Sequence, residues 1–253
     1  MAFLRLGRGE PLLFSPGITA HHRLPRGWDL KFELSQLREL ARRREVWWVN
    51  RRAGLAPGTT MADLAGDYAK VIRNQFGGPV DVLGVSTGGS VALQLAADHP
   101  EAVRRLVLVC AACRLGSRGR GCQREVARWL RAGRPRRAGA AMFAILGSGL
   151  VSLALWTAAG WLTGPLMFRG GAPDLCLTID AEDAFDLSAR LGAIAAPTLV
   201  IGGDRDRAYG AELFRQTAAG IPGARLLLYP RTGHAGVQMR RRFAGDVMEF
   251  LSG

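Results

Sequence analysis

A serine lies in a glycine-rich turn between an apolar run and a helix-like run. The turn, Gly84-Val85-Ser86-Thr87-Gly88-Gly89, follows residues 79–83 and precedes residues 90–97. A strand-to-helix turn of this G-x-S-x-G form exposes the serine hydroxyl, and glycines beside it remove side chains that would clash. Amides at the start of the following helix can stabilise negative charge at the same point. Ser86 is therefore a candidate nucleophile and Thr87 a candidate amide donor.

A serine hydroxyl needs a base, and a histidine oriented by a carboxylate serves best. His234 lies in the loop after the last predicted strand, whereas the other histidines lie in an early loop or at a helix end. The loop after the preceding strand carries two candidate carboxylates, Asp204 and Asp206. The chain order Ser, Asp, His favours this assembly over an incidental serine in a glycine-rich turn.

The elements that would position these residues alternate between strand and helix. Apolar runs predict strands, the first two of them as a hairpin or strand pair, at 3–6, 11–14, 45–49, 79–83, 103–110, 197–202 and 224–229. Helical spacing of apolar residues predicts helices at 33–44, 61–76, 90–97, 211–219 and from about 239 to 251. Strands separated by helices imply a parallel, doubly wound sheet that is covered on both faces.

Residues 114–190 interrupt this alternation. A basic, glycine-rich part, 114–137, precedes a stretch without a charged residue, 138–168, and an acidic part, 174–186. The uncharged stretch is long enough to cross a membrane. We expect its glycines and Pro165 to break it into short helices, and a span here would divide the sheet. We therefore predict a lid that is buried or lies at an interface.

Length and composition bound the remaining possibilities. The 253 residues suit one large α/β core, 1–113 and 191–253, with a helical, apolar lid insertion at 114–190. The net charge of +13 comes almost entirely from scattered arginines, and no nucleic-acid-binding motif accompanies it, so we expect no nucleic-acid partner. No signal peptide precedes the first strand, and we expect the cytosol.

The four cysteines do not suggest a disulfide framework in a chain of this length. Cys110 and Cys113 have C-x-x-C spacing, yet no second pair or nearby histidine completes a metal site. We therefore predict reduced thiols and no metal.

These motifs together resemble the α/β-hydrolase superfamily, and the resemblance covers the chain except the lid. The strand before the acid reads Pro-Thr-Leu-Val-Ile-Gly at 197–202, as is common in the family. The family's acid is the third residue beyond a glycine, which from Gly203 selects Asp206 and leaves Asp204 in reserve. The resemblance implies an α/β-hydrolase fold, a mostly parallel doubly wound sheet with a helical cap or lid inserted after the sixth strand.

Two segments depart from the family's pattern. Pro16-Gly17 stands where the oxyanion loop usually reads His-Gly. Backbone amides do not need that histidine, so the resemblance implies an oxyanion hole formed by the amides of Ile18 and Thr87. Asn50-Arg51-Arg52-Ala53-Gly54 replaces the start of the common Asp-x-Arg-Gly-x-Gly, whose role is largely structural, so we expect no catalytic role there.

We call the turn at residues 84–89 the elbow. Dehalogenases and epoxide hydrolases of the superfamily carry aspartate at this position, so the serine here implies acyl chemistry. We predict a serine esterase or lipase-like hydrolase of an ester, lactone or thioester, without a cofactor. Ser86 attacks the carbonyl, His234 transfers the proton, and Asp206 orients His234. Carbon-carbon bond hydrolases and hydroxynitrile lyases share such a triad. A receptor, or a cyclase or lyase of a biosynthetic pathway, is the alternative of another class.

The lid contains many large apolar side chains, and we therefore expect a lipophilic small-molecule substrate. Phe143, Trp156 and Trp161 are the candidate substrate-binding residues, the alternative being that they only form the lid's own core. The basic flank at 114–137 predicts weak contact with an anionic membrane surface. The sequence does not define the oligomeric state.

Overall fold

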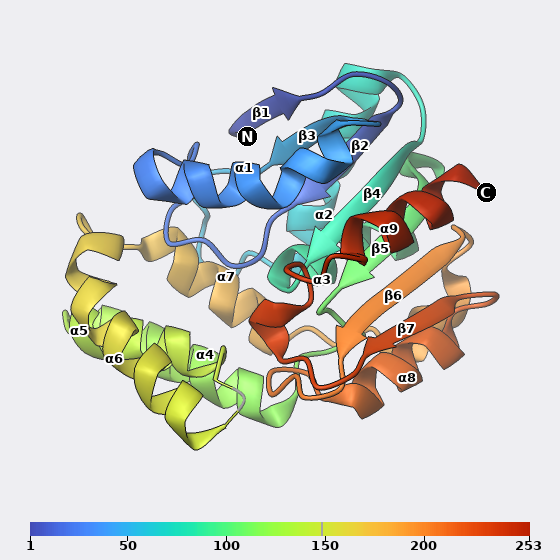
Figure 1. The fold of residues 1–253 in the computed structure, drawn as a ribbon. Coiled ribbons are helices and arrows are strands. Elements are labelled where there is room, and N and C mark those ends of the chain that lie inside the picture. The colour runs from blue at the N-terminus through green and yellow to red at the C-terminus, as the bar shows by residue number, and fades with distance from the viewer. Residues whose placement is uncertain (148) are drawn as a thin grey trace.

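A seven-stranded sheet runs through the centre of the molecule (Figure 1). The computed structural model describes residues 1–147 and 149–253. The strand order is β1-β3-β2-β4-β5-β6-β7, with β1 antiparallel to β3 and all other neighbours parallel. The strands are β1 (Phe3–Leu6), β2 (Pro11–Ser15), β3 (Glu45–Val49), β4 (Val80–Val85), β5 (Val103–Val109), β6 (Thr198–Gly203) and β7 (Arg225–Tyr229). The predicted α/β-hydrolase fold with a mostly parallel sheet is confirmed.

Helices cover both faces of the sheet. In Figure 1, α1 and α9 lie in front of it, and α2 and α3 behind. Each set packs into its own apolar cluster with one face of the strands, α8 joining the cluster of α2 and α3. These helices are α1 (Gly27–Ala41), α2 (Met61–Phe76), α3 (Thr87–Asp98), α8 (Ala211–Gly220) and α9 (Phe243–Ser252). Short 3-10 helices are η1 (Pro100–Ala102), η2 (Ser188–Ala193) and η3 (His234–Gly236).

Local sequence signals account for several of these boundaries. Thr60 and Asp63 form a reciprocal capping box at the start of α2, and Gly77 ends that helix in the left-handed conformation with φ 71°. All six residues of β4 are buried, because parallel strands are covered on both faces. The capping box and the helix that follows it confirm the predicted start of α2 at Met61.

Two local predictions are wrong. β1 and β2 do not pair with each other, because β3 lies between them and pairs with both. The closing helix begins at Phe243 rather than near Met239, which is 78% exposed outside it. In both cases an apolar pattern shows that residues can be buried but does not show which neighbour buries them.

Among the described residues, four α-helices separate β5 from β6. They are α4 (Ser117–Arg131), α5 (Pro135–Ala144), α6 (Leu150–Met167) and α7 (Pro173–Asp183). In Figure 1, three of them, α4, α5 and α6, lie at the lower left, and α7 lies between these three and the sheet. The insertion follows the fifth strand of this chain, not a sixth, because five strands precede residue 114. We refer to residues 114–190 as the lid segment.

The predicted break-up of the uncharged stretch is wrong for α6, which continues through Gly160, Gly164 and Pro165. A Cβ on Gly139 of α5 would come within 2.1 Å of the Gly160 carbonyl oxygen and 2.8 Å of the Gly164 Cα. The glycines therefore allow two helix backbones to touch, and this packing offsets their low helix propensity. Among the described residues, α6 is the one helix that is long and apolar enough to cross a membrane.

Candidate active site

Ser86 lies in a strained turn between β4 and α3. Its φ is 51° and its ψ −123°, a conformation that a residue with a Cβ rarely adopts. The turn is close-packed, since a Cβ on Gly84 would come within 2.5 Å of the Gly88 carbonyl oxygen. A Cβ on Gly88 would likewise come within 2.2 Å of the Ser15 carbonyl oxygen. The glycines thus allow the elbow to form and Ser86 to point away from it.

The structure brings three of the predicted residues into one chain of hydrogen bonds. His234 Nε2 lies 3.1 Å from Ser86 Oγ, and His234 Nδ1 lies 2.8 Å from Asp206 Oδ2. With Nδ1 protonated, His234 donates to Asp206 and offers its Nε2 lone pair to the Ser86 hydroxyl. This arrangement can move a proton from Ser86 to His234.

Asp206 and Asp204 lie in different environments. Asp206 is buried, and its Oδ1 accepts the backbone amides of Ala208 at 2.8 Å and Tyr209 at 3.2 Å, which fixes the carboxylate. Asp204 is exposed and accepts the Thr232 amide at 3.1 Å. The geometry therefore favours Asp206 over Asp204 as the partner of His234.

The charges of this pair shift its proton equilibria in opposite directions. Burial alone would lower the pKa of His234, but the nearby Asp206 carboxylate and its hydrogen bond raise that pKa above its ordinary value. Burial alone would raise the pKa of Asp206, but the His234 charge and hydrogen bond, with the two backbone amides, lower it. Asp206 therefore stays ionised and strengthens His234 as a base.

The two predicted oxyanion donors lie on segments that meet at the elbow. Gly17 passes Ser86, since a Cβ on Gly17 would lie 3.6 Å from the Ser86 Cβ. Thr87 is the first residue of α3 and is fully buried. Within the described residues, neither the Ile18 nor the Thr87 amide donates to another protein group. Both amides are thus available to a ligand.

Arg51 was not predicted to contribute, yet it holds the loop that carries Ile18. Its buried guanidinium donates to the carbonyl oxygens of Pro16 at 3.0 Å and Gly17 at 2.9 Å. It also donates to the Thr19 hydroxyl at 3.1 Å. The one sequence signal was its position directly after β3, where the carboxyl ends of parallel strands place functional loops.

Glu182 is a second residue that the sequence did not reveal. This fully buried carboxylate from α7 accepts four hydrogen bonds, from Thr87 Oγ1 at 2.7 Å, Ser90 Oγ at 2.8 Å, Gln123 Nε2 at 2.8 Å and Tyr209 Oη at 3.3 Å. The Tyr209 ring in turn stacks on His234 at a centroid distance of 6.0 Å. Glu182 therefore joins the lid segment to the elbow and to the histidine.

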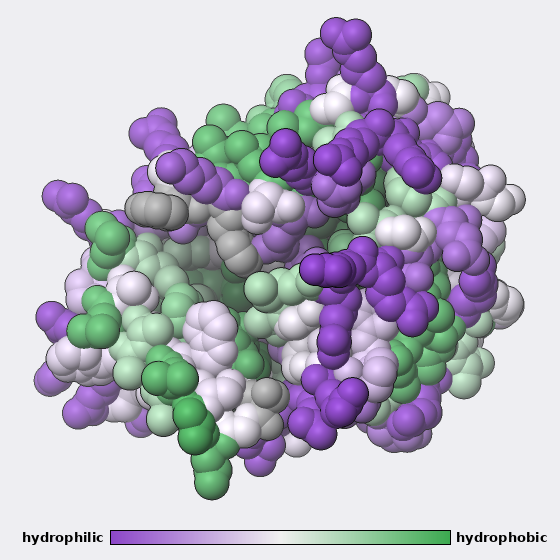
Figure 2. Space-filling model, viewed as in Figure 1, coloured by the Kyte–Doolittle hydropathy of each residue, from purple (hydrophilic) through white to green (hydrophobic). Residues whose placement is uncertain are grey.

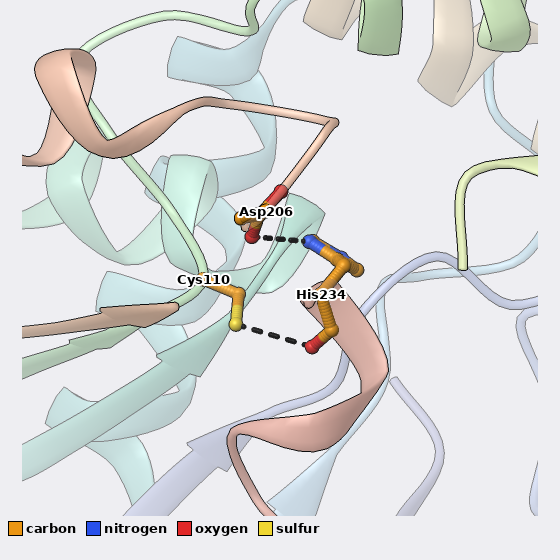
Figure 3. A group of neighbouring side chains, drawn as sticks. All are labelled: Cys110, Asp206 and His234. Atoms are coloured by element: carbon orange, nitrogen blue, oxygen red, sulfur yellow. Dashed lines mark hydrogen bonds and ion pairs between the residues drawn. The ribbon is translucent and has the colours of Figure 1, made fainter. Parts of the chain in front are cut away.

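Cys110, Asp206 and His234 each offer one possible ligand atom within 4.8 Å of the others (Figure 3). The donor set does not fit a metal ion. His234 Nδ1 and Asp206 already share a hydrogen bond, and burial raises the pKa of the Cys110 thiol well above its ordinary value, so the thiolate ligand is disfavoured. The thiol instead donates to the His234 backbone oxygen, at 3.3 Å from Sγ.

The three predicted substrate-binding residues lie together in the lid segment. Phe143 and Trp156 meet edge to face, 5.8 Å between centroids, and Arg136 lies over the Trp161 ring at 4.3 Å. Trp156 is 38% and Trp161 47% exposed. These contacts lie within the α5–α6 pair, and a role in substrate binding stays a prediction.

A cavity of about 730 Å³ opens beside Asp206. Among the described residues its lining includes Tyr209, Arg118, Arg205 and Arg207 but neither Ser86 nor His234. It therefore borders the acid end of the hydrogen-bonded chain rather than the serine.

Residues 12–246 match the alpha/beta hydrolase family. "Putative carbamate hydrolase RutD" of Variovorax paradoxus is 30% identical over 258 residues, covering 96% of this chain and 92% of the relative. A hydrolase from Pseudomonas aeruginosa has a similar structure, with a TM-score of 0.81 at 26% identity, covering 99% of this chain and 94% of the other. The enol-lactonase from Burkholderia xenovorans has a TM-score of 0.80 at 21% identity, covering 99% and 96%. The first is similar in sequence, the second in sequence and in fold, and the third shows likeness of fold.

Proposed function

Because the chain belongs to the alpha/beta hydrolase family, we propose that it is a serine hydrolase that forms an acyl-enzyme on Ser86. It cleaves an ester-type bond, in an ester, lactone or thioester, of a lipophilic small molecule. The observation that carries the proposal is the bonded series Ser86, His234 and Asp206, with 3.1 Å and 2.8 Å between the participating atoms.

Each residue has one role in the proposed reaction. His234 Nε2 takes the proton of Ser86 as its oxygen attacks the carbonyl carbon, and returns that proton to the leaving group. Asp206 stabilises the charged imidazole and fixes its orientation. The Ile18 and Thr87 amides donate to the oxygen of the tetrahedral intermediate. Water then attacks the acyl-enzyme by the same route in reverse, and no cofactor takes part.

A lipophilic substrate is favoured by the apolar composition of the lid segment, whose residues 138–168 carry no charge. Each methylene of an acyl chain that enters such surroundings adds about 0.8 kcal/mol. We expect kcat/KM to rise from acetyl to medium-chain p-nitrophenyl esters. Replacing Trp156 or Trp161 by alanine is expected to flatten this rise while sparing acetyl turnover.

The decisive experiment is labelling with a fluorophosphonate probe, combined with turnover of these esters, a lactone and, because of the Variovorax relative's name, a carbamate. Ser86→Ala should stay folded and lose both labelling and turnover, the latter on the order of 10⁴-fold. If Ser86→Ala retains turnover within a few fold, the proposal is wrong. If the folded native protein is not labelled at all, the alternative of a small-molecule receptor is favoured.

A further inference from the structure

Helix α6 presents an unusual amount of apolar surface to solvent. Five large side chains, Leu150, Val151, Leu155, Leu162 and Leu166, are between 66% and 87% exposed. The last four recur at intervals of four and seven residues and so lie along one side of the helix. We call these five residues the apolar face of α6. A soluble protein rarely exposes so many neighbouring large apolar groups unless they meet a partner.

The way α6 packs explains why this face points outward. Its buried residues are Gly160 and Gly164. They lie against α5, where a Cβ on Gly164 would come within 2.2 Å of the Pro135 carbonyl oxygen. The helix is thus buried at its smallest residues and leaves the five large side chains of the apolar face exposed. Figure 2 shows the result as separate green side chains that protrude over α6 at the lower left, with purple groups at the margin.

The surroundings of this face are basic. Residues 126–173 include six arginines and no aspartate or glutamate. Four of these arginines form no ion pair with a carboxylate of the described residues, namely Arg134, Arg136, Arg137 and Arg169. Arg136 also stacks on Trp161, so a cation and an amphipathic ring lie together at the carboxyl half of α6. Tryptophan and arginine beside an apolar face are typical of groups at a lipid headgroup boundary.

We propose that the apolar face of α6 docks the protein on an anionic lipid surface, with the arginines contacting the headgroups. The leucines enter the outer acyl region while the charged groups stay in the headgroup layer. A second copy of the chain is a poorer partner, because a symmetric contact would meet the same arginines and no carboxylate from 126–173 to pair with them. This inference does not depend on the proposed reaction.

The contacts of α6 favour a helix that lies in the surface rather than one that crosses it. Its backbone touches α5 along Gly139, Gly160 and Gly164. Soon after α6 ends, Asp174 accepts the backbone amides of Gly54 at 3.0 Å and Leu55 at 2.8 Å, which attaches the chain to the core again. Crossing a bilayer would separate α6 from both.

Vesicle flotation of the full chain tests the proposal, with phosphatidylcholine vesicles that contain or lack phosphatidylglycerol. We expect binding to the anionic vesicles, release by high salt, and little binding to pure phosphatidylcholine. The double variant Leu155→Glu/Leu162→Glu should lose binding about tenfold or more, and so should Arg136→Gln/Arg137→Gln. Thermal unfolding should show all variants folded as the native chain.

Matched control variants change an exposed apolar residue and two exposed arginines outside the lid segment. Met239→Glu changes an apolar residue that is 78% exposed outside the lid segment, and Arg43→Gln/Arg241→Gln removes two exposed arginines far from α6 in sequence. Both should bind as the native chain does. The proposal is overturned if the controls lose binding equally, if neutral vesicles bind as well, or if carbonate fails to extract the protein. Light scattering that shows a dimer without lipid, abolished by Leu155→Glu/Leu162→Glu, would also overturn it.

Discussion

Thr87 Oγ1 donates a 2.7 Å hydrogen bond to the buried carboxylate of Glu182, so the residue next to the candidate nucleophile is held by a helix of the lid segment. The other predicted amide donor is Ile18. Arg51 holds its loop by donating to the carbonyl oxygens of Pro16 and Gly17. Two buried, opposite charges therefore secure the two segments that would form the oxyanion hole. Glu182 and Arg51 can each be substituted while Ser86, His234 and Asp206 stay unchanged.

Glu182→Gln removes a negative charge that raises the pKa of His234. Without it that pKa falls, so His234 loses its proton at lower pH and the acid limb of kcat/KM shifts to lower pH. We also expect a loss of about 1–3 kcal/mol in the free energy of unfolding, because the four donors lose part of their acceptor. pH profiles and urea unfolding measure the two effects. The control Glu125→Gln, a half-exposed acid of α4, should change neither. An unshifted acid limb in Glu182→Gln would show that the residue is only structural.

Arg51→Lys keeps the charge but loses the fork that holds two carbonyl oxygens at once. We expect kcat to fall roughly 10²-fold with little change in KM, because the Ile18 amide would be misplaced when the oxyanion forms. Steady-state ester kinetics on the folded variant measure this. The neighbouring Arg52→Lys, whose native side chain pairs with Asp67, is the matched control. A rise in KM at constant kcat would place Arg51 in substrate binding instead.

Asp206→Asn and Asp204→Asn separate the two candidate acids. The amide at 206 would no longer fix the productive tautomer of His234, so turnover should drop on the order of 10⁴-fold. Asp204→Asn should have a mild effect, because Asp204 bonds to a loop amide and not to the histidine. The measurement is kcat/KM for a short ester. The reverse ranking would move the role to Asp204, and two mild effects would mean that neither residue is the acid.

His22 predicts a pH dependence of stability. Burial, followed by the charge of Arg51, lowers its pKa to about 4 from an ordinary value of 6.5. The folded state thus resists protonation while the unfolded chain accepts it, so this stability is present above about pH 6.5 and is lost as pH falls toward 4. The loss amounts to at most about 3 kcal/mol. Urea unfolding of His22→Gln should show a shallower decline over this window, and His99→Gln should decline like the native protein.

The sheet and the elbow could be predicted because their signals are local. Apolar runs, glycines around Ser86 and a capping box at Thr60 depend on neighbours in sequence. The candidate triad could also be predicted, since residue type and chain order select Ser86 and His234, and the family resemblance prefers Asp206 to Asp204. The contributions of Arg51 and Glu182 could not be predicted. Their partners Pro16 and Thr87 lie 35 and 95 residues away, and only the folded structure shows these contacts. The length of α6 escaped prediction for the same reason, because the contact that stabilises its glycines belongs to α5.

The glycine contact between α5 and α6 has a mechanical consequence. Two helices whose backbones touch at Gly139, Gly160 and Gly164 cannot slide past each other without a clash. Glycines with positive φ stand at both ends of the pair, Gly133 before α5 and Gly170 and Gly171 after α6. A methyl group at any of the three contact positions would therefore push the two helices apart.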